Sequence, residues 1–217
     1  MKGLPNPLRG VLLDWDGTLL NSYAADLVAY RAMFAALGID WGEREVRRHY
    51  SPNWHHIYRA ARVPRKLWPL ADRVWLQTAL RARPPLLPGA RRTLRWLARR
   101  YQLGLVTSGS RARVVRQLRR LGLTALFPAR VCAEDASPRK PHPAPLRLAL
   151  RKMRLGAEHC IYVGDAPEDV IMARRAGVFV AGVLGPFPTH RRLRAARPDV
   201  LLASVAELPA LLRACKK

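Results

Sequence analysis

Two carboxylates at one turn indicate where this chain could carry out chemistry. Asp14 and Asp16 follow an apolar run directly, and Gly17 comes next. Carboxylates at the end of a buried strand are costly unless they meet a cation, and a divalent metal ion is the natural partner. Because Gly17 lets the backbone turn, Asp14 could attack phosphorus while Asp16 protonates the leaving oxygen. An ordinary turn or helix cap at a strand end is the alternative.

Two further segments could bind a phosphoryl group. Thr107 and Ser108 end another apolar run, where they could donate hydrogen bonds to phosphate oxygens. The alternative is a helix N-cap, for which Ser110 is a candidate. Lys140 lies in a proline-rich turn before a helical stretch and could neutralise a nucleophilic carboxylate and a transferring phosphoryl group. In a chain this basic, a solvated surface lysine is the alternative, and the neighbouring His142 is interpreted as a turn residue.

A fourth segment places acids at the end of an apolar run in a region otherwise rich in arginine. It contains Asp165, Glu168 and Asp169. Mg²⁺ prefers oxygen ligands, typically one or two carboxylates with water and substrate phosphate completing an octahedron. These side chains could therefore contribute to a magnesium site. Glu168 could instead be a first-turn helix residue that responds to the helix dipole.

Short β-prone runs alternate with longer stretches of helical spacing through most of the chain. We expect strands at residues 11–13, 103–106, 130–132, 161–163, 178–183 and 200–202, and helices at residues 89–100, 111–121, 143–154 and 167–176. This order predicts an α/β fold with a Rossmann-like, doubly wound parallel sheet. Ligands bind at the carboxyl ends of the strands in such sheets, so the four segments should meet there.

Residues 21–87 differ from the rest of the chain. They contain no good strand run, and glycines and prolines break them into several helical stretches. We predict a small all-helical cap, residues 21–87, inserted into a catalytic core formed by residues 1–20 and 88–217. The aromatic and histidine residues of segment 49–59 could line the closed site, but such residues at helical spacing more often pack inside a small helical bundle, which is the favoured interpretation.

All four segments resemble, in order, the motifs of the haloacid dehalogenase (HAD) superfamily. The first is Asp14-Trp-Asp-Gly-Thr-Leu, the second Thr107-Ser-Gly, the third Lys140-Pro-His-Pro and the fourth Gly-Asp165. The resemblance extends to residues 176–177 and 183–185. It covers the whole predicted core.

The resemblance implies a role for each motif residue. Asp14 would be the nucleophile, and Asp16 the general acid/base whose main-chain carbonyl also binds Mg²⁺. The Thr107 hydroxyl and the Ser108 amide would hold the phosphoryl group, as would Lys140. Asp14 and Asp165 would bind Mg²⁺ directly, and Asp169 would hold a metal-bound water or Lys140.

By the same resemblance, the chain is expected to be a magnesium-dependent phosphatase that forms an aspartyl-phosphate and hydrolyses small phosphate monoesters. Haloacid dehalogenases proper lack the second aspartate, so Asp16 favours a phosphatase. The insertion point resembles the helical-cap subclass, which includes phosphoglycolate phosphatase and β-phosphoglucomutase. Mutases of that subclass carry a histidine where this chain has Asp26, which favours hydrolysis. Phosphoglycolate phosphatase is the nearest named activity; sugar phosphates, nucleotides and pyrophosphate remain alternative substrates.

Composition bounds these expectations. The chain has 217 residues, and 39 Lys and Arg against 15 Asp and Glu give a formal net charge of +24. The basic residues are spread along the chain, which favours a solvated surface over a nucleic-acid site. A nucleic-acid end phosphatase and a basic nucleic-acid-binding protein stay as less favoured alternatives. The three scattered cysteines predict neither disulfides nor a zinc site, and the sequence has no membrane-spanning or secretory segment, so we expect a cytoplasmic location. The oligomeric state is not predicted.

Overall fold

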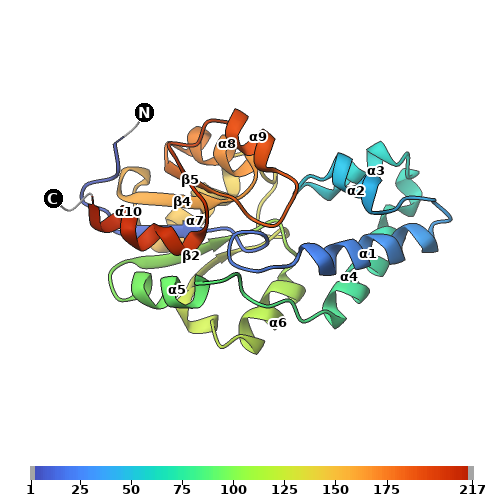
Figure 1. Ribbon diagram of the computed structural model, residues 1–217, viewed down its shortest axis with the longest axis horizontal. Helices are drawn as coiled ribbons and strands as arrows, with labels where there is room; N and C mark the ends of the chain where they lie inside the picture. The colour runs from blue at the N-terminus through green and yellow to red at the C-terminus, as the bar shows by residue number, and fades with distance from the viewer. Residues whose placement is uncertain (1–2, 215–217) are drawn as a thin grey trace.

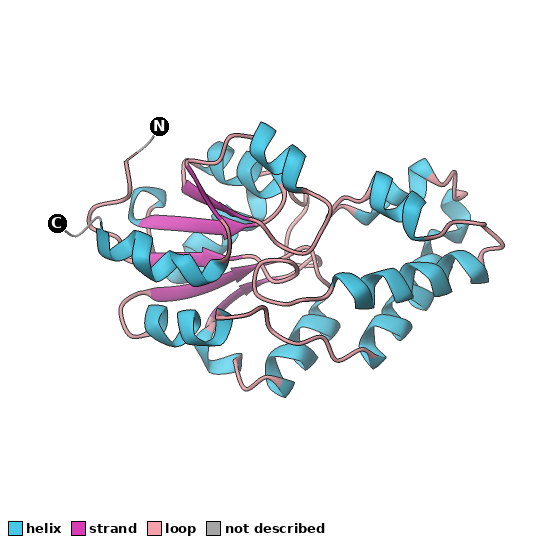
Figure 2. Ribbon diagram, in the orientation of Figure 1, coloured by secondary structure: helices cyan, strands magenta, loops and turns pink. Residues whose placement is uncertain are grey.

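The computed structural model describes residues 3–214 as an α/β protein built on a parallel sheet (Figures 1 and 2). Its strands are β1 (Gly10–Leu13), β2 (Gln102–Val106), β3 (Ala129–Val131), β4 (Cys160–Gly164), β5 (Phe179–Val183) and β6 (Val200–Leu202). The spatial order is β3-β2-β1-β4-β5-β6, and every neighbouring pair is parallel. The chain winds outward from β1 to β3 and then crosses to β4. This confirms the predicted doubly wound sheet, and it places the topological switch point between β1 and β4.

Helices cover both faces of the sheet because the strands are apolar on both sides. Val11 and Leu13 of β1 pack with one set of helices and Leu12 with the other. The first set comprises α5 (Ala90–Ala98), α6 (Arg111–Arg120) and α10 (Leu208–Ala214); the second comprises α7 (Ala144–Met153), α8 (Pro167–Ala176) and α9 (His190–Ala195). Short 3₁₀ turns lie at Arg65–Leu67, Thr124–Leu126, Ala157–His159 and Val205–Glu207. All four helices expected for the core are present, with ends within about two residues of the predicted ones.

The inserted segment forms a separate helical layer beyond the carboxyl ends of the strands (Figure 2). It contains α1 (Tyr23–Ala36), α2 (Glu43–His49), α3 (Trp54–Ala60) and α4 (Trp68–Arg81). These helices bury their own apolar cluster, which includes Met33, Phe34 and Ile57. Phe187, from the loop after β5, joins that cluster and stacks on Tyr50 with ring centroids 4.6 Å apart. The predicted helical cap is therefore present and packs against the core.

The chain leaves the core for the cap and returns to it through two segments that lie side by side. The Leu87 amide donates to the Leu19 carbonyl at 2.8 Å, and the Asn21 amide donates to the Pro85 carbonyl at 2.9 Å. An antiparallel bridge joins the same two segments between these bonds. Both ends of the cap are thus fixed at one point of the core.

The described part of the chain bears on two further expectations. Among residues 3–214, no helix is both long and apolar enough to cross a membrane. Cys132 and Cys160 are buried free thiols, and burial raises their pKa values to about 11 and about 12. The third cysteine, Cys215, lies outside the described residues.

Candidate active site at the carboxyl ends of the central strands

The three central strands each end in one of the predicted site residues. Asp14 follows β1, Thr107 follows β2 and Asp165 follows β4. The Asp14 amide continues the ladder by donating to the Val163 carbonyl at 2.9 Å. Because β1 lies between β2 and β4, Asp14 occupies the centre of the site. All three side chains are buried.

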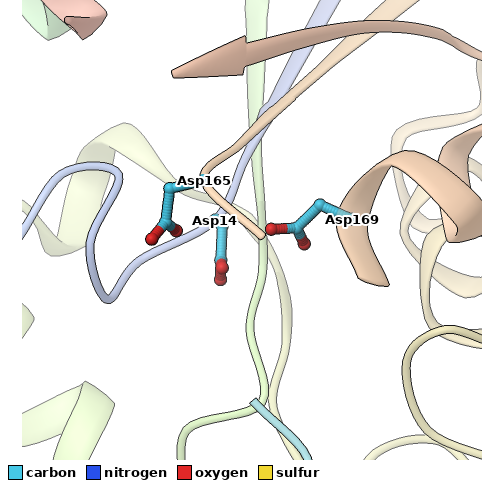
Figure 3. Close-up of side chains that lie close together, drawn as sticks. All are labelled: Asp14, Asp165 and Asp169. Atoms are coloured by element: carbon cyan, nitrogen blue, oxygen red, sulfur yellow. The ribbon is translucent and has the colours of Figure 1, made fainter. Parts of the chain in front are cut away.

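Three buried carboxylates converge beside β1 (Figure 3). One oxygen each from Asp14, Asp165 and Asp169 lies within 4.8 Å of the others. Burial raises the pKa of Asp14 to about 7, although Lys140 opposes this shift. Burial and the neighbouring Asp14 raise the pKa of Asp165 well above its usual value. A cluster of oxygen donors whose charges are this poorly solvated fits a hard divalent cation such as Mg²⁺.

Asp169 differs from the other two acids because protein groups occupy both of its oxygens, whereas the Trp15 amide and the Thr18 hydroxyl donate only to Oδ1 of Asp14 and of Asp165, at 2.7 and 3.1 Å. Its Oδ1 accepts from Lys140 Nζ at 2.7 Å and from the Tyr162 hydroxyl at 2.9 Å, and its Oδ2 accepts from the Ala166 amide at 3.1 Å. Asp14 and Asp165 are therefore the better placed side chains to bind a metal ion directly. The geometry suits Asp169 to positioning Lys140.

Lys140 is buried in the centre of this cluster. Its side chain is 3% exposed, which excludes a solvated surface lysine. The ammonium lies 3.1 Å from Asp14 Oδ1 and donates to the Tyr162 hydroxyl at 2.7 Å. Burial disfavours its charge, but Asp14 and Asp169 outweigh that effect and raise the pKa of Lys140 to about 12. A fixed positive charge thus lies against the predicted nucleophile.

The second predicted segment faces the same cavity from the end of β2. Thr107 and Ser108 both line it. The Thr107 hydroxyl oxygen accepts from the Gly109 amide at 2.9 Å, which holds the loop in a tight turn and leaves the hydroxyl proton free to donate. Ser110 does occupy the N-cap position of α6, as the alternative interpretation suggested, but its side chain makes no capping hydrogen bond.

Asp16 is a predicted residue whose carboxylate pairs with groups outside the acidic cluster. Its carboxylate forms a bidentate ion pair with Arg113 of α6, with Nη1–Oδ1 and Nη2–Oδ2 distances of 2.8 and 2.5 Å. The Ser22 hydroxyl also donates to Oδ1 at 2.7 Å. Although burial disfavours the charge, Arg113 holds the pKa of Asp16 below its usual value. In this arrangement Asp16 is a stabilised carboxylate.

Sequence reasoning did not single out Arg113 or Tyr162. Arg113 lies on the buried face of α6 together with Val114, Gln117 and Leu118. That face could have been found from the spacing, but one arginine among 39 basic residues gave no signal of its own. Tyr162 is in the middle of the apolar strand β4, where nothing in the sequence marks it as a polar partner of the site.

The cap closes a cavity of about 260 Å³ over these residues. Tyr50, Trp54 and Tyr58, from segment 49–59, line this cavity, which was the less favoured of the two interpretations. Ile57, from the same segment, packs inside the cap, in agreement with the favoured interpretation. The segment therefore does both.

Besides the Ser22–Asp16 bond, two direct hydrogen bonds hold the cap against the core near the cavity. The Ser51 hydroxyl donates to Glu168 at 2.8 Å, and Arg192 of α9 donates to the Tyr50 carbonyl at 2.6 Å. Glu168 thus contacts the cap, besides lying in the first turn of α8. His142 is a turn residue that accepts from the Ala144 amide at 3.2 Å.

Gly185 allows the loop after β5 to approach the first motif. A Cβ atom built on it would overlap the Gly17 carbonyl, which is backbone and cannot rotate away. We expect Gly185→Ala to displace the turn that carries Asp16, to lower turnover and to lower the free energy of unfolding by about 1–3 kcal/mol. Urea unfolding and phosphatase assays would measure both, with Gly3→Ala as the control because a Cβ at Gly3 meets nothing within 4 Å. Unchanged stability and activity in Gly185→Ala would contradict this account.

Comparison with known proteins identifies relatives of the same architecture. Residues 11–183 match the family described as haloacid dehalogenase-like hydrolase. A phosphoglycolate phosphatase from Yersinia pestis is 30% identical over 93% of this chain and 91% of its own length. A validoxylamine A 7'-phosphate phosphatase from Streptomyces hygroscopicus subsp. limoneus is 30% identical over 91% of this chain and 94% of its own length. The crystal structure of a CbbY mutant from Rhodobacter sphaeroides, in complex with xylulose-(1,5)bisphosphate, is 25% identical with a TM-score of 0.80 over 93% of this chain and 96% of that one.

The family match spans most of the chain. The similarity to the two curated relatives extends over nearly the whole length of each of them. The observed strand order and the helical insert after β1 agree with the resemblance drawn from the four motifs. This chain belongs to the haloacid dehalogenase-like hydrolase family.

Proposed function

We propose that the protein is a magnesium-dependent phosphatase that hydrolyses small phosphate monoesters through an aspartyl-phosphate on Asp14. The observation that carries the proposal is the position of Asp14 at the floor of the capped cavity, against Lys140 and beside Asp165. Relatives named as phosphatases for phosphoglycolate and for validoxylamine A 7'-phosphate support the reaction class.

In the proposed reaction, each residue has one task that follows from its surroundings. Asp14 attacks phosphorus with one carboxylate oxygen, while Lys140 offsets the negative charge of the carboxylate and the phosphoryl group. The Thr107 hydroxyl and the Ser108 amide donate to the phosphoryl oxygens. Asp14 and Asp165, with the main-chain carbonyl of Asp16, would hold Mg²⁺, which when bound supplies charge neutralisation to the acidic cluster and to the phosphate.

Asp16 completes the cycle as acid and then as base. It protonates the leaving alcohol oxygen, and the resulting carboxylate takes a proton from the water that hydrolyses the aspartyl-phosphate. Its ion pair with Arg113 must open, and Asp16 must take up a proton from solvent, before it can act as the acid, because a carboxylate held in a bidentate ion pair carries no proton to donate. The step therefore depends on what displaces Asp16 from Arg113.

We assign residues 1–20 and 88–217 to the catalytic core and residues 21–87 to the cap, and we place the protein in the cytoplasm. The paired segments at residues 19–21 and 85–87 support this division, and the buried free thiols of Cys132 and Cys160 suit a reducing compartment. A cavity of about 260 Å³ favours a small ester over the end of a nucleic acid.

Removal of the metal tests the proposal. With Mg²⁺, the protein should release phosphate from p-nitrophenyl phosphate and from members of a panel of phosphoglycolate, sugar phosphates, nucleotides and pyrophosphate. EDTA should lower the rate by about 100-fold or more, and added Mg²⁺ should restore it. Circular dichroism recorded with EDTA serves as the control for folding. Absence of turnover on every member, or turnover that EDTA leaves unchanged in a folded protein, would overturn the proposal.

A further inference from the structure

A buried guanidinium forms part of the cavity wall, opposite in charge to the acidic cluster. Arg113 of α6 is 4% exposed and lines the same cavity as Asp14. Its Cζ lies 5.5 Å from the centroid of the Trp75 ring of the cap, and its Nε is buried without a hydrogen-bond partner among the described residues. Arg113 is therefore held between core and cap, with unused hydrogen-bonding capacity.

The groups around Arg113 place it next to the loop that is expected to hold the phosphoryl group. A Cβ atom at Gly109, two residues after Thr107, would lie 2.6 Å from Arg113 Nη2. The glycine thus leaves the space that the guanidinium occupies. Asp26 lines the same cavity, but burial and the charge of Asp16 raise its pKa to about 8, so that it cancels little of the positive charge near neutral pH.

In this structure, the group that pairs with the Arg113 guanidinium is a carboxylate. Two parallel N–H···O bonds of 2.8 and 2.5 Å join Arg113 to Asp16, which is the geometry in which arginine recognises carboxylates and phosphates. Asp16 keeps a second hydrogen-bond partner, Ser22, and its side chain is 15% exposed, so it is the more easily displaced member of the pair. An anionic group of a substrate could take its place with the same bonds.

We propose that Arg113 binds a second anionic group of the substrate, a carboxylate or a second phosphate, and that this exchange releases Asp16 toward the ester that reacts. The inference rests on the proposed phosphatase function and deepens it. The preferred substrates are then small phosphate monoesters with another anionic group a short distance from the ester oxygen. Arg113 is the residue that selects them, and it couples their binding to delivery of the general acid.

A matched series of three substrates tests the proposal. Phosphoglycolate carries a carboxylate, 2-hydroxyethyl phosphate replaces that carboxylate by a neutral hydroxymethyl group, and ethane-1,2-diol bisphosphate carries a second phosphate. All three have alkoxide leaving groups that need protonation, so loss of Asp16 function alone lowers kcat/KM for each member equally. Wild type should favour at least one of the two doubly anionic members over 2-hydroxyethyl phosphate, and which one it favours identifies the anion.

The variants are Arg113→Gln and Arg113→Lys, the second of which keeps the charge near Asp16 if the first fails to fold. Each variant should lower the preference for the doubly anionic substrate by about 30-fold, because neither glutamine nor lysine can form the bidentate ion pair with the second anionic group. Arg116→Gln, an exposed arginine on the same helix outside this cavity, should keep the wild-type preference. Arg139→Gln removes the other cavity arginine, which lies over the Trp54 ring at 4.4 Å.

Three results would overturn the proposal. An equal loss on all three substrates in the Arg113 variants would mean that Arg113 only positions Asp16. Loss of the preference in Arg139→Gln but not in the Arg113 variants would assign the anion to Arg139. A wild type that turns over p-nitrophenyl phosphate with Mg²⁺ but shows no preference within the series would remove the subsite and leave the phosphatase function in place. Failure of the proposed function itself is recognised separately, as absence of turnover on p-nitrophenyl phosphate and on the whole panel.

Discussion

Replacement of Asp14 by asparagine is expected to lower kcat by about 10⁴-fold or more, because the proposed reaction forms its covalent intermediate on the Asp14 carboxylate. Asparagine has nearly the same shape, and it removes a carboxylate whose charged form is disfavoured by burial. The variant should therefore remain folded. Phosphate release from the best substrate of the panel, with Mg²⁺ present, measures the effect.

The covalent step gives this prediction a second readout. Mass spectrometry of acid-quenched wild type during turnover should show a phosphoryl adduct on the peptide that contains Asp14, and the Asp14→Asn variant should show none. Asp40→Asn, which changes an exposed carboxylate of the cap, is the matched control and should retain wild-type activity. An Asp14→Asn variant that still turns over at a tenth of the wild-type rate, or an adduct on another residue, would refute the assignment of the nucleophile.

Lys140→Met should have the second largest effect. The substitution keeps most of the side-chain volume and removes the ammonium that lies 3.1 Å from Asp14 and 2.7 Å from Asp169. Loss of a buried charge that stabilises the transferring phosphoryl group is expected to lower kcat by about 10²- to 10³-fold. The two carboxylates also lose their shared counter-ion, so that the free energy of unfolding without Mg²⁺ should fall by about 3 kcal/mol.

Urea unfolding and steady-state kinetics with saturating Mg²⁺ separate these two consequences. Mg²⁺ should restore part of the lost stability, since a divalent ion also compensates the acidic cluster, but it should not restore kcat. Lys66→Met, an exposed lysine near the start of α4, controls for loss of a positive charge in general. If Lys140→Met kept wild-type kcat, Lys140 would be a structural counter-ion only.

Much of the fold could be predicted because its determinants are local. Strands buried on both faces appear in the sequence as short apolar runs such as residues 161–163, and the helices between them have the spacing of one buried face. The order of these elements then leaves few topologies for a parallel sheet. Even the helical insert was visible, because residues 21–87 lack strand runs.

The polar network of the site depends on contacts between residues far apart in the chain, and here the sequence was less informative. Asp14, Thr107, Lys140 and Asp165 could be predicted as site residues because each lies at a strand end or in a turn with a recognisable pattern. The pairing of Asp16 with Arg113, 97 residues away, has no local pattern. The orientation of Asp16 is set by this packing between a loop and a helix, and only the three-dimensional structure reveals it.

The paired segments at residues 19–21 and 85–87 also have a consequence for how proteins of this architecture can diversify. The two ends of the insert are hydrogen-bonded to each other, so the whole cap is one closed loop attached to the core. The entropy cost of closing a loop grows only with the logarithm of its length, about 0.6 kcal/mol for each doubling. The entropy cost of closing the inserted segment is therefore nearly independent of the size of the cap. A cap of another size would change the wall of the cavity, while Asp14, Thr107 and Asp165 keep their places at the strand ends.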